Sequence, residues 1–378
     1  MSVHLQGITW EHERGHGSVV AASRAYREQQ PDVEITWTAR SLQAFADQPL
    51  EALVERYDLL VVDHPHIPSA AEEGLLAPLD EHLPAELDDA AFVGPSHATY
   101  RHGGAQYGLA TDAAAQVAAY RPDLLPEPPR TWPEVLELAR AGRVLWPAKP
   151  IDAFSSLVTL CAGTGAAVMT ADGFVDRDVF EESFQVLGEL ARLVPQECLS
   201  ANPIEVAERL TGSDRWAYAP LLFGYTNYSR EGYRATRLAY TDIPLRDGEP
   251  RGSLLGGAGI AVSARSRHVP EAARFAAWLA SGPVQRGAYF DGGGQPGHLA
   301  AWEDETLDAA TLGFFSGTRR TLEQAYVRPR HPRFLALQDT ASPWVTEALA
   351  GRTTPAELFE RLDQASRDHL REDDRARR

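Results

Sequence analysis

Residues 59–66 read Leu-Leu-Val-Val-Asp-His-Pro-His, four apolar side chains followed at once by polar ones. A strand that is apolar on both faces is typical of the interior of a parallel sheet, because helices cover both faces of such a sheet. The run from Leu59 to Val62 therefore predicts an interior strand. Asp63, His64 and His66 are expected in the loop at its carboxyl end, where open α/β sheets bind their ligands.

The segments upstream of this strand complete a β-α-β-α-β pattern. The apolar spacing predicts strands over residues 5–10 and 33–37. It also predicts two helices: one that is capped by Ser18 and carries Val19, Ala22 and Tyr26, and one over residues 50–57. This alternation predicts an α/β fold. The loop over residues 11–17, which follows the first strand, is the second place where a ligand is expected.

The composition limits the class of protein. A chain of 378 residues is long enough for two to three domains, and 44% hydrophobic with 24% charged residues is typical of a globular protein. The formal net charge of −17 repels phosphate backbones and anionic membrane surfaces. We therefore expect no nucleic-acid partner and, because no apolar run approaches 18 residues, no membrane insertion.

The sequence contains no specific motif for a cofactor or a nucleophile. The two cysteines, Cys161 and Cys198, lack a CxxC or zinc spacing, and neither a G-x-S-x-G elbow nor a nucleotide-binding glycine loop occurs. The pairs His12 with His16 and His64 with His66 could in principle ligate a metal, but paired histidines are common by chance. We expect no cofactor and no metal.

The N-terminus begins Met-Ser-Val-His-Leu-Gln-Gly, without a basic region, an apolar core or a cleavage site. As the sequence stands, this predicts a cytoplasmic protein. If a signal peptide was removed, a periplasmic or extracellular location is expected instead.

Several segments of the chain resemble family 1 extracellular solute-binding proteins, the maltose-binding-protein-like group. The resemblance begins with Tyr107-Gly-Leu-Ala-Thr-Asp112 and the stretch from Val117 to Leu136, which includes Pro-Arg-Thr-Trp132-Pro-Glu-Val-Leu. Further segments follow the same order and spacing: 74–79, 256–263 leading into 271–279, 328–333 and 348–358.

This resemblance implies a type II periplasmic-binding-protein-like fold, with two α/β lobes and a ligand cleft between them that closes by a hinge. The first lobe is expected to comprise residues 1–111 plus 258–310, and the second residues 112–257 plus 311–378. The first crossing between lobes is expected near residues 111–113.

Candidate ligand-binding residues follow from the strand ends and from the family positions. In the first lobe they are Trp10, Glu11, Asp63, His64 and His66, followed at the crossings and the glycine turn by Asp112, Gly257 and Gln295. In the second lobe, aromatic platforms and an amide are expected to clamp the ligand: Trp146, Tyr225, Asn227 and Tyr228.

Two functions are compatible with these residues. The first is a monomeric small-molecule receptor for a sugar or polar organic acid, of the ABC-transporter solute-binding type, with an ABC permease as partner if the chain is exported. The alternative is a cytoplasmic enzyme or ligand sensor on the same fold, in which His64, His66 and Asp63 are the catalytic candidates for proton transfer. The residues alone leave open whether the protein is an enzyme.

Overall fold

The computed structural model describes residues 2–42, 44, 49–246 and 248–371. Contacts within the chain divide it into two compact units. Unit 1 comprises residues 1–114, 225–227 and 256–311, and unit 2 comprises residues 115–224, 228–255 and 312–378. The chain thus passes between the units five times.

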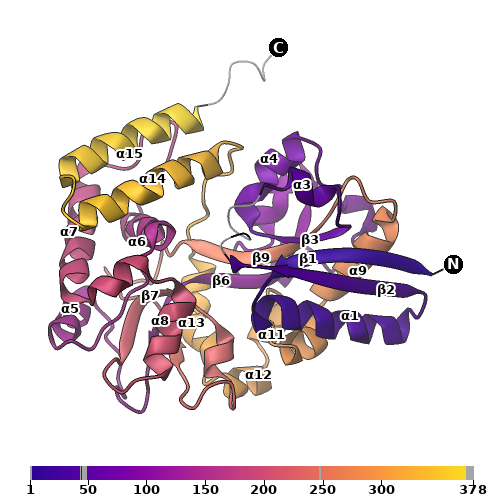
Figure 1. The fold of residues 1–378 in the computed structure, drawn as a ribbon, viewed down its shortest axis with the longest axis horizontal. Coiled ribbons are helices and arrows are strands. Elements are labelled where there is room, and N and C mark those ends of the chain that lie inside the picture. The colour runs from indigo at the N-terminus through magenta and orange to yellow at the C-terminus, as the bar shows by residue number, and fades with distance from the viewer. Residues whose placement is uncertain (1, 43, 45–48, 247, 372–378) are drawn as a thin grey trace. The chain divides into compact units, whose positions relative to one another are not determined.

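Unit 1 contains a β-sheet and several helices (Figure 1). Its strands are β1 (Val3–Trp10), β2 (Val33–Arg40), β3 (Leu59–Val62), β4 (Arg101–His102), β5 (Ala105–Gln106), the first part of β6 (Gly108–Tyr120) and nearly all of β9 (Leu255–Val262). Its helices are α1 (Ser18–Gln29), α3 (Glu51–Val54), α4 (Ile67–Glu72), α9 (Val269–Ala280), α10 (Gly282–Val284), α11 (Leu299–Trp302) and α12 (Glu305–Ala310).

The parallel strands predicted from the sequence are confirmed. β1 pairs in parallel with β2, from Val3 opposite Val33 onward, and with β3, where Gly7 lies opposite Leu59. On its other edge β3 pairs antiparallel with β9. The interior position predicted for β3 is therefore correct, but only one of its two neighbours is parallel.

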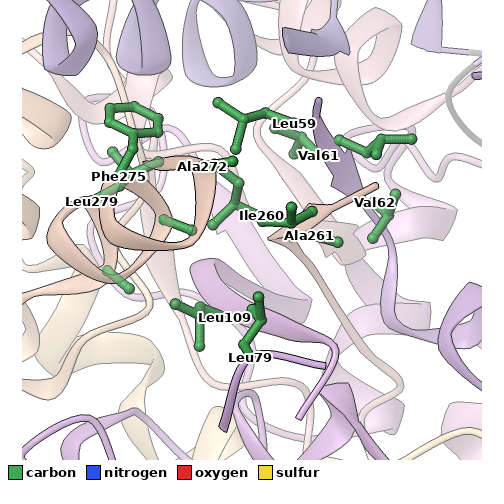
Figure 2. Close-up of a cluster of buried hydrophobic side chains, with 14 of the residues drawn as sticks. Leu59, Val61, Val62, Leu79, Leu109, Ile260, Ala261, Ala272, Phe275 and Leu279 are labelled. Carbon is green, nitrogen blue, oxygen red and sulfur yellow. The ribbon is translucent and has the colours of Figure 1, made fainter. Parts of the chain in front are cut away.

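The core of unit 1 forms where β3 and β9 meet α9. Figure 2 shows Leu59, Ile260 and Phe275 in this cluster, and all three side chains are fully buried. Burial of one such side chain stabilises the fold by roughly 1.5–3 kcal/mol. The β3–β9 pair is thereby fixed, and with it the loop that begins at Asp63.

Unit 2 contains the remainder of β6, with β7 (Tyr218–Phe223) and β8 (Ala239–Thr241) both antiparallel to it. Its helices are α5 (Trp132–Arg140), α6 (Pro150–Ala162), α7 (Arg177–Leu193), α8 (Pro203–Thr211), α13 (Phe314–Glu323), α14 (Phe334–Leu349) and α15 (Pro355–Leu370). α14 and α15 lie side by side in Figure 1. Capping boxes begin α5 at Thr131, α8 at Asn202 and α15 at Thr354.

Two local expectations differ from the structure. The helix predicted over residues 50–57 is only the four residues of α3, so that Tyr57 lies outside it. Ser18 is the first residue of α1 rather than its cap, and its hydroxyl donates to the carbonyl oxygen of Arg14 at 2.7 Å. The chain is already helical before Ser18, because residues 13–17 form a π-helical turn.

Candidate functional site

The loop after β1 enters α1 through the wide turn Glu13–Gly17. The imidazole Nδ1 of His12 accepts a hydrogen bond from the backbone N–H of Arg14 at 3.0 Å and so caps the turn. Turns of π-helical type are rare and occur frequently at functional sites, because they move one side chain out of the regular helical register. Here the displaced side chain is that of Arg14, which points into unit 1 and is buried.

Glycines bring this loop into contact with two neighbouring segments. A Cβ on Gly17 would lie 2.6 Å from the carbonyl oxygen of Gly292, and a Cβ on Gly15 would lie 2.4 Å from the indole ring of Trp10. The glycine turn over residues 291–295, expected to approach a ligand, thus approaches the backbone of this loop. The backbone at Gly15 covers part of the Trp10 indole, which is itself only 5% exposed.

We expect Gly17→Ala to lower the free energy of unfolding by roughly 1–3 kcal/mol, because the added methyl group collides with a backbone atom rather than a movable side chain. Chemical denaturation measures the change. Gly188→Ala in α7 is the matched control: its Cβ would meet nothing nearer than the Arg192 side chain at 3.8 Å, so it should be neutral or slightly stabilising. Equal effects of the two substitutions would contradict the assigned contact.

At the centre of the site, Arg14 binds Asp112 through two parallel hydrogen bonds. Nε and Nη2 of Arg14 donate to the two carboxylate oxygens of Asp112, each at 2.6 Å. The side chains are 5% and 1% exposed, respectively. Burial raises the pKa of Asp112, and the guanidinium opposes that rise. For Arg14, burial alone would lower the pKa, but the carboxylate raises it, so the guanidinium keeps its charge.

Tyr225 covers the guanidinium of Arg14. Its ring centroid lies 4.5 Å from Cζ of Arg14, a cation–π contact, and His12 contacts the same ring edge-on at 5.0 Å. Tyr225 belongs to the three-residue segment 225–227 of unit 1.

Hydrogen bonds from the glycine turn hold that segment. Gln295 Oε1 accepts from the backbone N–H of Thr226 at 2.9 Å, and Asn227 Nδ2 donates to the carbonyl oxygen of Gly293 at 3.0 Å. Gln295 Nε2 also donates to the carbonyl oxygen of Ala113 at 2.8 Å. Gln295 and Asn227 were both predicted to contact ligand, and in the structure their side-chain amides hold backbone groups in place.

Gly257 allows two backbone segments to approach each other closely beside the Arg14–Asp112 pair. Its φ of +103° lies in the region that favours glycine, and a Cβ there would lie 2.6 Å from the carbonyl oxygen of Asp112. β9 can therefore approach β6 closely beside the Arg14–Asp112 pair.

The loop after β3 lies near this pair. Asp63 is half-buried, and its charge contributes to the raised pKa of Asp112. His64 and His66 are 2% and 8% exposed, so neither imidazole lies on a solvated rim. The His64 ring lies 6.4 Å from that of Tyr100.

The remaining predicted residues are placed elsewhere. Glu11 is exposed in unit 1, and its backbone N–H donates to the carbonyl oxygen of Arg40. Trp146 and Tyr228 belong to unit 2 and are buried: the indole Nε1 of Trp146 donates to Ser156 Oγ at 3.1 Å, and the hydroxyl of Tyr228 donates to Glu208 at 2.7 Å. Either aromatic ring would have to be uncovered before it could stack on a ligand.

Sequence reasoning missed Arg14 and Tyr289. Tyr289 is buried, hydrogen-bonds with Ser18 and Thr111, and lies close enough to Asp112 and Arg14 to feel their charges; burial raises its pKa well above the usual range. No local pattern joins Arg14 to Asp112, which is 98 residues away. The one available signal was a lone arginine between Glu13 and Gly15, in a loop already predicted to contact a ligand.

Within residues 2–42, 44, 49–246 and 248–371, no group of three or more His, Cys, Asp or Glu side chains is arranged to hold a metal ion. Among the helices of that same part of the chain, none is both long and apolar enough to cross a bilayer.

Residues 21–311 match the family described as bacterial extracellular solute-binding protein. This match covers about three quarters of the chain and includes the Arg14-binding residue Asp112, Tyr225, Asn227, Gly257 and Gln295.

Solved structures of similar proteins share the fold over the whole length. Maltose-bound MalE3 of T. maritima is 18% identical, with a TM-score of 0.82 over 98% of this chain and 99% of that one. The GacH receptor of Streptomyces glaucescens, solved unliganded and with acarbose, is 17% identical, with a TM-score of 0.81 over 98% and 99%. An ABC-transporter solute-binding protein of Thermotoga lettingae, bound to α-D-tagatose, is 18% identical, with a TM-score of 0.83 over 98% and 100%. The expected type II periplasmic-binding-protein fold is thereby confirmed.

Proposed function

Because this chain belongs to the family of bacterial extracellular solute-binding proteins, we propose that it is the solute receptor of an ABC transporter and binds a neutral, hydroxyl-rich small molecule, a sugar or a polyol. Both units are proposed to contribute ligand contacts. The proposed partner is an ABC permease, and the receptor is proposed to work as an exported monomer.

The observation that carries this proposal is the polar edge of the unit 1 sheet. β1 and β3 run in parallel side by side, so the loops after Trp10 and Val62 begin at the same edge of the sheet. Ligands of open α/β sheets bind at this edge. Glu11, Asp63 and the Arg14 loop supply hydrogen-bonding groups there.

The charges at this edge favour a neutral ligand over an organic acid. Arg14 is the cation of the loop, and its two hydrogen bonds to Asp112 already neutralise it. In the loops after β1 and β3 the further charges are the carboxylates of Glu11, Glu13 and Asp63. Arg40, at the end of β2, is buried and donates a hydrogen bond to the carbonyl oxygen of Ala44 at 3.1 Å. Carboxylates accept hydrogen bonds from hydroxyl groups and repel anions, so these side chains suit a sugar or polyol.

Related proteins support the same ligand class. Besides the maltose-, acarbose- and tagatose-bound structures, solute-binding proteins of Agrobacterium vitis and Agrobacterium radiobacter were solved with D-mannitol and ribitol. The enzyme alternative gains no support from the family, and its two histidine candidates, His64 and His66, are buried.

Thermal-shift and calorimetric titration with maltose, α-D-tagatose, D-mannitol and ribitol tests the proposal, with citrate and succinate as the organic-acid arm. A sugar or polyol present at 100 times its Kd should raise the free energy of unfolding by about 2.7 kcal/mol. Binding of an acid alone, or of no compound in the panel, would overturn the proposed ligand class.

Tyr225→Ala should weaken binding of the compound that the native chain binds most tightly in this panel by about tenfold or more. The buried Tyr225 ring covers the Arg14 guanidinium, and its loss releases the loop that is proposed to contact the ligand. The matched control is Trp216→Ala in unit 2, where Arg215 lies 4.3 Å from the indole centroid in a similar cation–π contact. The control should bind like the native chain.

A further inference from the structure

The Arg14 cluster touches the chain where it passes between the units. Asp112 lies two residues before the passage at Ala114, and Tyr225 is the first residue of the short segment that returns to unit 1. Gly257, the second residue after the passage at Leu255, abuts the carbonyl oxygen of Asp112. Arg14 itself lies in none of these segments but in the loop proposed to contact ligand.

A second observation is that two π-helical segments meet at the cluster. One, Glu13–Gly17, carries Arg14; the other, Gln285–Tyr289, carries Tyr289. The Tyr289 side chain hydrogen-bonds with Ser18, at the end of the first segment, and with Thr111, beside Asp112. Both irregular turns thus aim a side chain at the start of the same chain passage.

The chemistry of the pair argues against a purely stabilising role. Removing two charges from water costs more than their attraction commonly returns, and apolar pairs of similar volume often stabilise a fold equally well. A bidentate Arg–carboxylate pair instead fixes distance and orientation, because both of its hydrogen bonds must be satisfied at once. The Arg14–Asp112 pair is therefore expected to fix the distance and orientation of the two segments that carry it.

We infer that Arg14 is a positioning residue: its bonds to Asp112 and its contact with Tyr225 hold the loop over residues 11–17 in fixed register with the chain segments that connect unit 1 to unit 2. This inference rests on the proposed receptor function, because it links the loop proposed to contact ligand to the segments in which the chain passes from one unit to the other. While the Arg14–Asp112 pair is intact, the loop over residues 11–17 and the connecting segments move together.

The main test variant is Arg14→Met combined with Asp112→Leu, which removes both charges and leaves neither buried alone. Arg14→Lys is the conservative variant, because it keeps the charge and loses the two-pronged geometry. The matched control is Asp123→Asn in unit 2. Asp123 also accepts two hydrogen bonds from one arginine, Arg121, but lies outside this cluster.

Two measurements on the ligand-free chain report the positioning. Hydrogen exchange is followed in peptides that cover residues 11–17 and 225–227, with residues 59–62 as the core reference. Spin labels on Glu28→Cys in unit 1 and Glu181→Cys in unit 2, both exposed positions, report the distribution of distances between the units. The natural thiols of Cys161 and Cys198 are buried and should label poorly.

In the double variant, we expect exchange at least tenfold faster in both peptides, unchanged exchange in residues 59–62, and a distance distribution about twice as wide. Arg14→Lys should show the same changes at smaller size, and Asp123→Asn none. The inference would be overturned if the double variant kept the native exchange rates and the native width of the distance distribution. It would also be overturned if exchange in residues 59–62 accelerated equally, because that result indicates a general stabilising role. If the double variant fails to fold, Arg14→Lys decides by the same criteria.

No solute is added in these measurements. A failure of the sugar panel would therefore overturn the proposed ligand class without affecting this test, and a negative result here would leave the receptor function standing.

Discussion

Replacing Asp152 with asparagine should stabilise the protein by on the order of 5 kcal/mol at pH 9, relative to the native chain, and change its stability little at pH 4. Asp152 lies in the first turn of α6 in unit 2 and is 5% exposed. Burial raises the pKa of its carboxyl group to about 8; Lys149 opposes this rise and Glu205 adds to it.

The sign follows from the direction of this shift. A carboxyl group with a pKa raised in the folded state binds its proton more tightly there than in the unfolded chain, where the pKa is about 3.9. Its contribution is complete below about pH 4 and is lost as the pH rises through about 8. The folded and unfolded pKa values of this carboxyl group differ by about four, and each step of one corresponds to 1.36 kcal/mol, which gives the expected stabilisation of about 5 kcal/mol. The amino-terminal end of α6 favours a negative charge by only about 0.3–1 kcal/mol, so burial prevails.

Urea unfolding of both proteins between pH 4 and pH 9 measures the effect. Asp178→Asn is the matched control, because Asp178 also lies in the first turn of a helix, α7, but is exposed. Its difference from the native chain should stay nearly constant over this range. If the Asp152→Asn difference is equally constant, the buried carboxyl group does not hold its proton near neutral pH.

The strands of unit 1 could be predicted because their signals are local. The four apolar residues of β3 indicated burial on both faces, and the alternation of strands and helices indicated parallel pairing, which β1, β2 and β3 confirm. The pairing of β3 with β9 could not be predicted, because its partner lies about 200 residues further along the chain and nothing in either segment specifies direction. Nor could the shortness of α3, whose ends depend on tertiary packing rather than on propensity.

The candidate site divides in the same way. Residues 11–17 and 63–66 could be predicted as ligand-contacting loops, because strand ends in α/β sheets place their loops at one edge. The partner of Arg14 was not, since ion pairs between distant segments leave no mark in a single sequence. Gln295 in the glycine turn was predicted to contact a ligand; in the structure, Gly292 of this turn lies against Gly17 of the loop after β1.

A second large effect is expected at low pH, where His97 should account for about 3 kcal/mol of the stability that the native chain loses between pH 6.5 and pH 4. The imidazole of His97 is 1% exposed and stacks on Phe92 at 4.1 Å between ring centroids. Its Nδ1 accepts a hydrogen bond from the backbone N–H of Ala110 at 3.4 Å, on β6 just before the Arg14–Asp112 pair.

Burial lowers the pKa of His97 to about 4, with Arg101 and His298 adding to the effect and Asp88 opposing it. A depressed pKa means that the unfolded chain binds the proton first. The contribution of a neutral His97 is therefore complete above about pH 6.5 and is lost as the pH falls through about 4. His97→Asn keeps an acceptor near the position of Nδ1 and removes the titration. It should be less stable than the native chain at pH 7.5, because the stacked ring is lost, yet lose about 3 kcal/mol less on acidification.

The test of this assignment is how the free energy of unfolding changes with pH, and not its value at one pH. A smaller side chain lowers the free energy of unfolding at every pH, whereas only the loss of a titrating group makes the difference between variant and native chain depend on pH. Unfolding free energies at pH 7.5, 6, 5 and 4 give the slope. The control is His4→Asn on β1, which removes an imidazole that is 58% exposed; a change of slope that His97→Asn shows and His4→Asn does not is expected. Parallel curves for His97→Asn and the native chain would place the acid-labile group elsewhere. A shallower curve for His97→Asn alone would show that the strand leading to Asp112 is held at neutral pH by an imidazole that cannot accept a proton without giving up its bond to Ala110.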